Sequence, residues 1–165
     1  MIKKFVIAFC MLTLISVSAL AQKPQPTKNA VTSGSISIPA GSQDKKSLYT
    51  RLGGYDAIAL VVDDFITRLA TDKRFEKFFT GFSDDSKKRL RQHILDQFCA
   101  AAGGPCVYTG REMRTSHKGL GITEADWDAA AKHLVEALDK YKVSEAEKNE
   151  LLAFVVTQKK DIVEK

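Results

Sequence analysis

The stretch Tyr55–Ala70, YDAIALVVDDFITRLA, decides the fold class of this 165-residue chain. Apolar side chains recur along it at intervals of three and four residues, at Ile58, Val61, Val62, Phe65 and Leu69. This interval places them on one face of an α-helix, because a helix completes a turn in about 3.6 residues. We therefore predict an amphipathic helix over residues 55–70 whose apolar face packs into a hydrophobic core.

Similar spacing continues to the end of the chain, and residues that cap helices precede the later apolar series. These caps are Ser83, Thr123 and Ser144. The helix that begins after Ser83 is predicted to end at Gly103-Gly104-Pro105. A short helix should follow and carry Met113 and His117. The sequence thus predicts an all-α domain of about five helices.

The first 21 residues have the layout of a secretory signal peptide. Lys3 and Lys4 precede an apolar run over residues 5–20 that carries no charge, and Ala19-Leu20-Ala21 fits a signal-peptidase site. The run is shorter than the roughly 20 residues that a membrane span needs. We expect cleavage after Ala21 and a periplasmic or secreted protein, with membrane attachment only if the leader stays uncleaved.

Residues 22–46 are predicted to form a flexible tether between the leader and the helical domain. They are rich in Ser, Pro, Gly, Thr and Lys, so they cannot bury enough apolar surface to offset the entropy of ordering. The tether has four Lys and one Asp, the leader has two Lys, and the whole chain has a formal charge of +5. Residues 47–165 are therefore net neutral. We expect no nucleic-acid partner, because acids interrupt the basic clusters of the domain.

The chain contains three histidines, His93, His117 and His133. His93 lies beside the apolar stripe of its predicted helix, and His133 lies off the stripe of its own. Imidazole is a common metal ligand, but three histidines scattered in this way define no metal geometry. Spacing alone therefore favours a structural role for each of them.

A longer series of short motifs carries a family resemblance. In chain order the series includes Leu48-Tyr49, Leu52-Gly53-Gly54, Phe78-Phe79-Thr80-Gly81, Tyr108-Thr109-Gly110, His117-Lys118-Gly119 and His133-Leu134. Over about 115 residues, this order and spacing resemble the group I truncated haemoglobins. The resemblance implies that residues 47–165 form a truncated globin-like two-over-two helical sandwich that holds haem b.

Matched position by position, the resemblance implies a haem site made by Phe65, Ile66, Phe79, Leu90, His93, Ile94, Tyr108, Met113, His117 and Trp127. His117 matches the proximal histidine, whose neutral imidazole binds the haem iron and leaves the opposite axial position for a ligand. Trp127 stands where the family usually has Phe. Three arginines are candidates for contacts with the haem propionates: Arg89, Arg91 and Arg114.

The distal side departs from the family pattern. Members that hold oxygen tightly usually have Tyr at the position of Ile66, and Gln is frequent at the positions of Leu90 and Ile94. Aliphatic side chains donate no hydrogen bond to a bound ligand. His93 matches a position that some members use as a second, reversible iron ligand. Two alternatives remain for His93: it binds the iron together with His117, or it contacts a haem propionate or water.

Two cysteines, Cys99 and Cys106, lie outside the predicted leader. An oxidising compartment would permit a disulfide that joins the end of a helix to the loop leading to His117. The alternative is a buried Cys99 and a free Cys106. Covalent haem attachment through Cys-x-x-Cys-His is excluded, because the chain lacks that motif.

The resemblance implies an exported haem b protein that reversibly binds oxygen or another diatomic gas, NO or CO. The alternatives are a bis-histidine haem protein for redox chemistry or electron transfer, which would need a redox partner, and a haem enzyme that detoxifies NO or peroxide. Ligand binding is favoured over catalysis, with NO dioxygenase or peroxidase chemistry as a side activity. A helical module that has lost haem is disfavoured, because His117, Phe79 and Tyr108 are all present.

Overall fold

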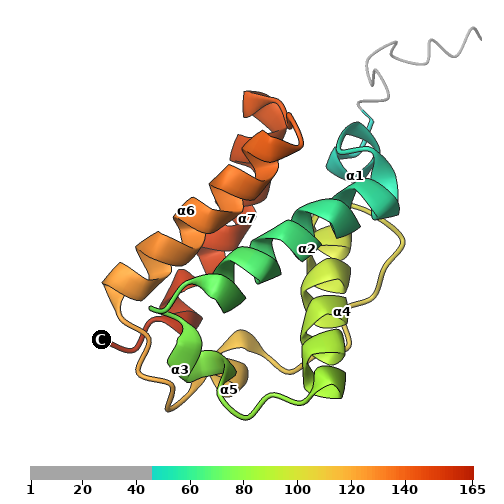
Figure 1. Cartoon of the computed structure of the whole chain (residues 1–165). Helices are drawn as coiled ribbons and strands as arrows, with labels where there is room; N and C mark the ends of the chain where they lie inside the picture. Colours follow the sequence, from blue (N-terminus) through green and yellow to red (C-terminus); the bar gives the residue numbers. More distant parts are fainter. Residues whose placement is uncertain (1–45) are drawn as a thin grey trace, which may run out of the picture. The chain divides into compact units, whose positions relative to one another are not determined.

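The computed structural model describes residues 46–165, and this part of the chain is all-α, as predicted. Its seven helices are α1 (Leu48–Arg51), α2 (Gly54–Thr71), α3 (Glu76–Phe79), α4 (Asp84–Ala101), α5 (Met113–His117), α6 (Glu124–Lys140) and α7 (Glu145–Ile162) (Figure 1). The predicted signal peptide, residues 1–21, and residues 22–45 of the predicted tether lie outside the described residues. No helix among residues 46–165 combines the length and the apolar content that a bilayer crossing requires.

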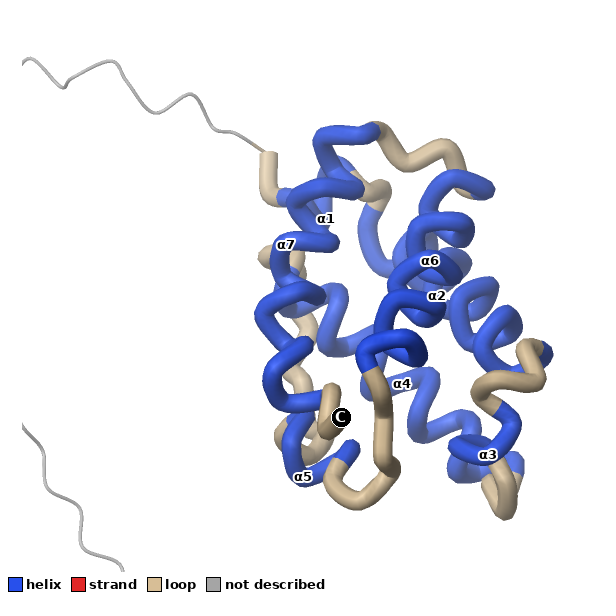
Figure 2. The backbone as a smooth tube through the Cα atoms, turned by 90° about the vertical axis from the view of Figure 1, so that its left-hand side faces the viewer, coloured by secondary structure: helices blue, strands red, loops and turns tan. Residues whose placement is uncertain are grey.

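Four long helices make up the body of the domain. Helix α2 packs against both α4 and α6, and α7 packs against α6, α4 and the short helix α5. Figures 1 and 2 show α2 crossing between the other long helices, while α3, α5 and the start of α4 lie at one end of the domain. This arrangement confirms the predicted two-over-two sandwich.

The core forms where these helices cross. Its buried side chains are Ile58, Val61 and Val62 of α2, Leu95 and Phe98 of α4, Leu134, Ala137 and Leu138 of α6, and Leu151 of α7. The apolar stripe predicted from residues 55–70 therefore does face the core, although Phe65 and Leu69, toward its end, are only half-buried. Removal of these side chains from water is the main term that stabilises the fold.

The predicted helix starts are confirmed by hydrogen bonds. Ser83 accepts one from the Ser86 amide at 3.2 Å, and Ser144 accepts one from the Glu147 amide at 3.5 Å. Thr123 forms the predicted reciprocal capping box with Asp126. Hydrogen bonds from Thr123 hold the pKa of the Asp126 carboxyl below its usual value. Each cap satisfies an amide that would otherwise lack a partner at a helix start.

The predicted number of helices, five, was too low for the described residues. The two additional helices, α1 and α3, have four residues each. A segment of about one turn is too short to show the apolar repeat that identifies a helix in a sequence. Such helices depend on tertiary packing and local caps, because an isolated helix of this length is unstable in water.

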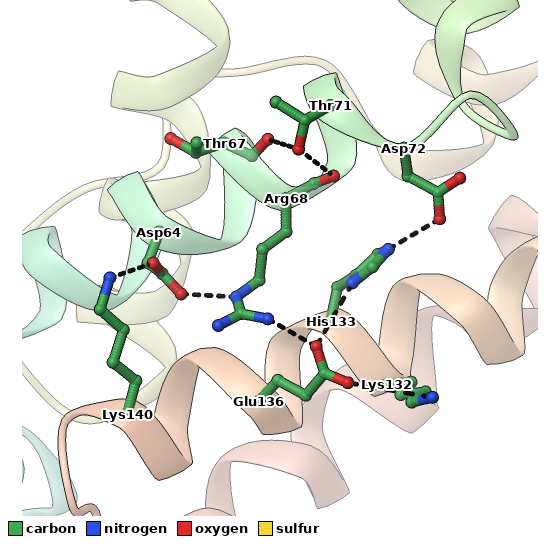
Figure 3. Close-up of polar contacts among 9 residues, drawn as sticks. All are labelled: Asp64, Thr67, Arg68, Thr71, Asp72, Lys132, His133, Glu136 and Lys140. Atoms are coloured by element: carbon green, nitrogen blue, oxygen red, sulfur yellow. Dashed lines mark hydrogen bonds and ion pairs between the residues drawn. The ribbon is translucent and has the colours of Figure 1, made fainter.

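A polar network joins α2 to α6 and includes His133 (Figure 3). Arg68 of α2 donates hydrogen bonds to Asp64 at 2.6 Å and to Glu136 of α6 at 2.5 Å. His133 of α6 lies with Nε2 2.9 Å from Oδ2 of Asp72, at the end of α2. This hydrogen bond lowers the pKa of the Asp72 carboxyl. His133 therefore has the structural role that its spacing favoured.

Candidate functional site

His117 is the last residue of α5, and its ring is held by a hydrogen bond within that helix. Its Nδ1 lies 2.8 Å from the backbone oxygen of Met113. A carbonyl oxygen can only accept, so Nδ1 donates and carries the ring proton. The lone pair is then on Nε2, and the half-buried ring has the tautomer and the fixed orientation that a histidine needs to bind a metal.

A disulfide joins the end of α4 to the loop that leads to this histidine. Cys99 and Cys106 are bonded, with their Cα atoms 5.7 Å apart. The predicted pairing is therefore confirmed over the alternative of two free thiols. Close packing at this corner requires Gly104, because a Cβ there would lie 2.5 Å from the Tyr49 ring and 2.7 Å from Sγ of Cys99.

Tyr108, in the loop between α4 and α5, packs against His93 of α4. The two ring centroids are 5.9 Å apart, in an edge-to-face arrangement. The Tyr108 hydroxyl donates to the backbone oxygen of Arg111 at 2.7 Å, and burial raises its pKa. His93 Nδ1 is buried and has no hydrogen-bond partner within residues 46–165. His93 and Tyr108, two residues of the predicted haem site that come from different segments of the chain, are thus in contact.

The apolar members of the predicted set are all half-buried. They are Phe65 and Ile66 of α2, Phe79 of α3, Leu90 and Ile94 of α4, Met113 of α5 and Trp127 of α6. Nearby residues on the same long helices, such as Val62, Leu95 and Leu134, are at most 1% exposed. Phe65, Ile66 and Ile94 also pack against the buried core from its edge. The set therefore provides an apolar surface that the polypeptide itself covers only in part.

The structure adds an aromatic residue that the sequence prediction missed. The ring of Phe82 meets that of Phe79 edge to face, with centroids 5.8 Å apart. Phe82 is 39% exposed, so its ring adds partly uncovered apolar surface beside Phe79. The signal available in the sequence was a second phenylalanine three residues after Phe79.

The three candidate arginines differ in whether a carboxylate already neutralises their charge. Arg91 donates to both carboxylate oxygens of Asp63 on α2, and this ion pair raises the Arg91 pKa. Arg114 bonds Asp161 of α7 through two nitrogens, at 3.0 and 2.6 Å. Arg89 contacts only the neutral Ser86 hydroxyl, at 3.3 Å, among the described residues. Arg89 is therefore the candidate whose charge remains available to an anionic group.

A cavity of about 450 Å³ lies between the end of α4, α5 and α7. Tyr108 and Met113, both in the predicted set, line it together with Phe154 of α7. Neither His93 nor His117 is among its lining residues. The cavity therefore shares two residues with the predicted haem site on the side facing α7, but it is not the space beside the two histidines.

The pattern of the bacterial-like globin family matches residues 47–164, nearly the whole of the described part of the chain. This chain belongs to the bacterial-like globin family. The globin is 37% identical over 109 residues to the group 1 truncated hemoglobin GlbN of Mycolicibacterium paratuberculosis, a match that covers 66% of this chain and 78% of that protein. It is 36% identical over 119 residues to GlbN of Nostoc sp., covering 72% of this chain and 98% of that one.

Solved structures show the same relationship for this globin. It superimposes on the 2/2 hemoglobin of Synechococcus sp. with a TM-score of 0.65 and 31% identity, covering 72% of this chain and 98% of that one. The truncated hemoglobin of Tetrahymena pyriformis superimposes with a TM-score of 0.66 and 28% identity, covering 73% and 100% of the two chains. The family resemblance and its fold are thereby confirmed.

Membership of this family implies a haem cofactor and small gas molecules as ligands. The residues present in this globin fit such a group. His117 offers one nitrogen with a lone pair, and half-buried aromatic and aliphatic side chains offer an apolar surface. His93 adds a second imidazole, whose buried Nδ1 has no hydrogen-bond partner within the described part of the chain.

Proposed function

We propose that this globin binds haem b through Nε2 of His117 and binds a diatomic gas reversibly. The observation that carries the proposal is the hydrogen bond of 2.8 Å between Nδ1 of His117 and the Met113 backbone oxygen. This hydrogen bond leaves the lone pair on Nε2, where it can bind the iron, and it limits rotation of the ring. When bound, haem supplies an iron centre that can accept oxygen, NO or CO.

The Met113 carbonyl has a second effect on the same ring. A hydrogen bond accepted from Nδ1 increases electron density on the imidazole and strengthens Nε2 as a donor. Outer partners of this kind change metal affinity or activity by about 10- to 100-fold when they are lost. Because the acceptor is a backbone atom within the same helix, the orientation of His117 depends on the integrity of α5.

The apolar residues would set how tightly the gas is held. Ile66, Leu90 and Ile94 lie at the positions expected to face the bound gas. They exclude water from the gas and offer the gas no hydrogen-bond donor. A ligand that develops negative charge is therefore retained less strongly than where Tyr or Gln donates to it. The absence of a donor from these three side chains supports reversible binding. It also favours the binding of NO and CO over that of oxygen, which needs a donor to be held tightly.

The test of this proposal is the visible spectrum of the ferric, ferrous and CO-bound protein. We expect purified protein supplied with haem to show a Soret band that shifts on reduction and again on addition of CO. A protein that takes up no haem in stoichiometric amount would contradict the proposal. Measured rates of oxygen and CO release would then identify the gas that is held most tightly.

We further propose that His93 is a reversible second axial ligand. Its ring lies against Tyr108, and its buried Nδ1 has no hydrogen-bond partner among residues 46–165, so no protein group restrains the ring at that atom. A histidine in this position would compete with the gas, which must displace it. The remaining alternative is contact with a haem propionate or with water.

The change His93→Ala should convert the ferric protein from a low-spin to a high-spin spectrum, because the sixth ligand is removed. We expect faster CO binding to the ferrous protein for the same reason. Gln92→Ala is the matched control: Gln92 is the preceding residue on α4, is exposed, and bonds Tyr55 and Asp96. A His93→Ala ferric spectrum identical to that of the unaltered protein would contradict ligation by His93.

Export to the periplasm or the medium completes the proposal. The leader over residues 1–21 supports it, and so does the Cys99–Cys106 disulfide, because structural disulfides persist mainly in oxidising compartments. Cleavage after Ala21 would leave residues 22–46 as a tether ahead of the globin domain.

A further inference from the structure

The segment that follows α7, Val163–Lys165, lies against the loop that follows His117. The Glu164 carboxylate accepts hydrogen bonds from the backbone amides of Gly119 and Gly121, at 2.5 and 2.6 Å, one on each oxygen. Figure 2 shows the end of α7 and the marked C-terminus close to α5. A side chain at the end of the last helix therefore reaches the backbone two residues after the proposed iron ligand.

The loop is shaped so that both amides can face the same carboxylate. Gly119 and Gly121 have φ of +84° and +64°, a left-handed conformation that residues with a Cβ rarely adopt. The hydrogen bonds from these two amides, with that from Gly119 the larger influence, lower the pKa of Glu164. Glu164 is thus ionised at neutral pH, and charged acceptors make the stronger hydrogen bonds.

Backbone hydrogen bonds hold the same two segments together. The amides of Glu164 and Lys165 donate to the Ile122 oxygen at 2.8 and 3.3 Å, and the Glu124 amide donates to the Lys165 oxygen at 3.1 Å. The segment after α7 therefore contacts the loop from Gly119 to the start of α6. Glu164 makes the contacts nearest to His117.

Helix α5 needs such external support. It has five residues, Met113–His117, and no side chain caps its start. Helices this short are unstable alone, because the cost of nucleation exceeds the gain from so few hydrogen bonds. The loop before α5 is joined to α4 by the Cys99–Cys106 disulfide, and Arg114 within α5 is paired with Asp161 of α7. Glu164 supplies the corresponding attachment on the other side of His117.

We propose that Glu164 is a positioning residue for His117: its carboxylate fixes the backbone that follows the histidine and thereby the direction of Nε2. The inference rests on the proposed function of His117 as the iron ligand. Loss of the carboxylate frees the Gly119–Gly121 turn, and His117 then samples orientations that weaken its bond to the metal.

The experiment compares Glu164→Gln with Glu150→Gln. Glu150 lies on α7, and its carboxylate pairs with the Arg51 side chain. Each variant therefore loses one negative charge that accepts hydrogen bonds, and only Glu164→Gln affects the turn after His117. Glu164 is exposed, and its replacement leaves the core intact. The readouts are haem transfer from the ferric protein to excess apomyoglobin, the midpoint potential of the iron, and amide hydrogen exchange at Gly119 and Gly121 in haem-free protein.

We expect Glu164→Gln to increase the rate of haem loss about tenfold, to shift the midpoint potential, and to speed exchange at both glycines. Glu150→Gln should stay within about twofold of the unaltered protein in all three readouts. Equal haem loss and equal potentials in the two variants would overturn the inference alone, even if exchange at the glycines rises. Unaltered protein that binds no haem would overturn the proposed function and this inference together.

Discussion

Replacement of His117 by alanine is expected to raise the rate of haem loss by about 100-fold or more, because the iron would lose the proximal ligand that we propose for it. Loss of an outer hydrogen-bond partner alone already costs up to about 100-fold in metal affinity. The remaining contacts would be the apolar side chains and the reversible bond that we propose for His93, which the gas displaces. Transfer of haem to excess apomyoglobin measures the rate, and the ferrous spectrum reports the lost ligand.

The matched control for this prediction is His133→Ala. It removes the same side chain from the domain, but His133 bonds Asp72 between α2 and α6. We expect the His133→Ala protein to retain haem with an unchanged spectrum and to unfold at a lower temperature, since the polar network of Figure 3 loses a member. Equal rates of haem loss in the two variants would show that His117 is not the ligand.

Leu134→Ala should lower the free energy of unfolding by about 3 kcal/mol, within the range measured for buried leucines. Leu134 is 1% exposed and belongs to the core that α2, α4, α6 and α7 share. The loss combines the apolar surface no longer buried with the cavity left behind. For a domain of this size the melting temperature should fall by about 10 °C or more.

Val156→Ala on α7 provides the comparison for Leu134. Val156 is 61% exposed, so its truncation should change the free energy of unfolding by less than about 0.5 kcal/mol. Denaturant unfolding of both variants in the same redox conditions measures the difference. A Leu134→Ala loss as small as that of Val156→Ala would show that the shared core is not what stabilises the sandwich.

The segment carrying His117 is attached to the rest of the domain on both sides. Before α5, the disulfide at Cys106 connects the loop to the end of α4. After α5, Glu164 and the backbone of the last residues hold the turn at Gly119 and Gly121. A five-residue helix can present a ligand in a fixed direction only if its neighbours are fixed, and these two attachments provide that.

Much of the fold could be predicted because the relevant signals are local. The long helices follow from the apolar repeat, and their starts follow from Ser83, Thr123 and Ser144, whose caps act within one turn. Helix α1 does begin at a capping residue, Ser47, but neither α1 nor α3 shows an apolar repeat, because four residues are too few to contain one. The pairing of Cys99 with Cys106 remained open in the sequence, since a spacing of seven residues permits a bond without requiring it.

For the candidate site, the sequence by itself determined the residue types and their order: His117 on a predicted short helix, aliphatic residues at the positions expected to face a bound gas, and a second histidine at position 93. Only the tertiary structure decided which partners they meet. In the folded domain Arg91 pairs with Asp63, and Arg114 pairs with Asp161. Tyr108 packs against His93, and Glu164 reaches the turn after His117. The physical reason is distance along the chain. Periodicity and caps act within a few residues, whereas these contacts join residues 15 to 47 positions apart, which meet only once the helices have packed.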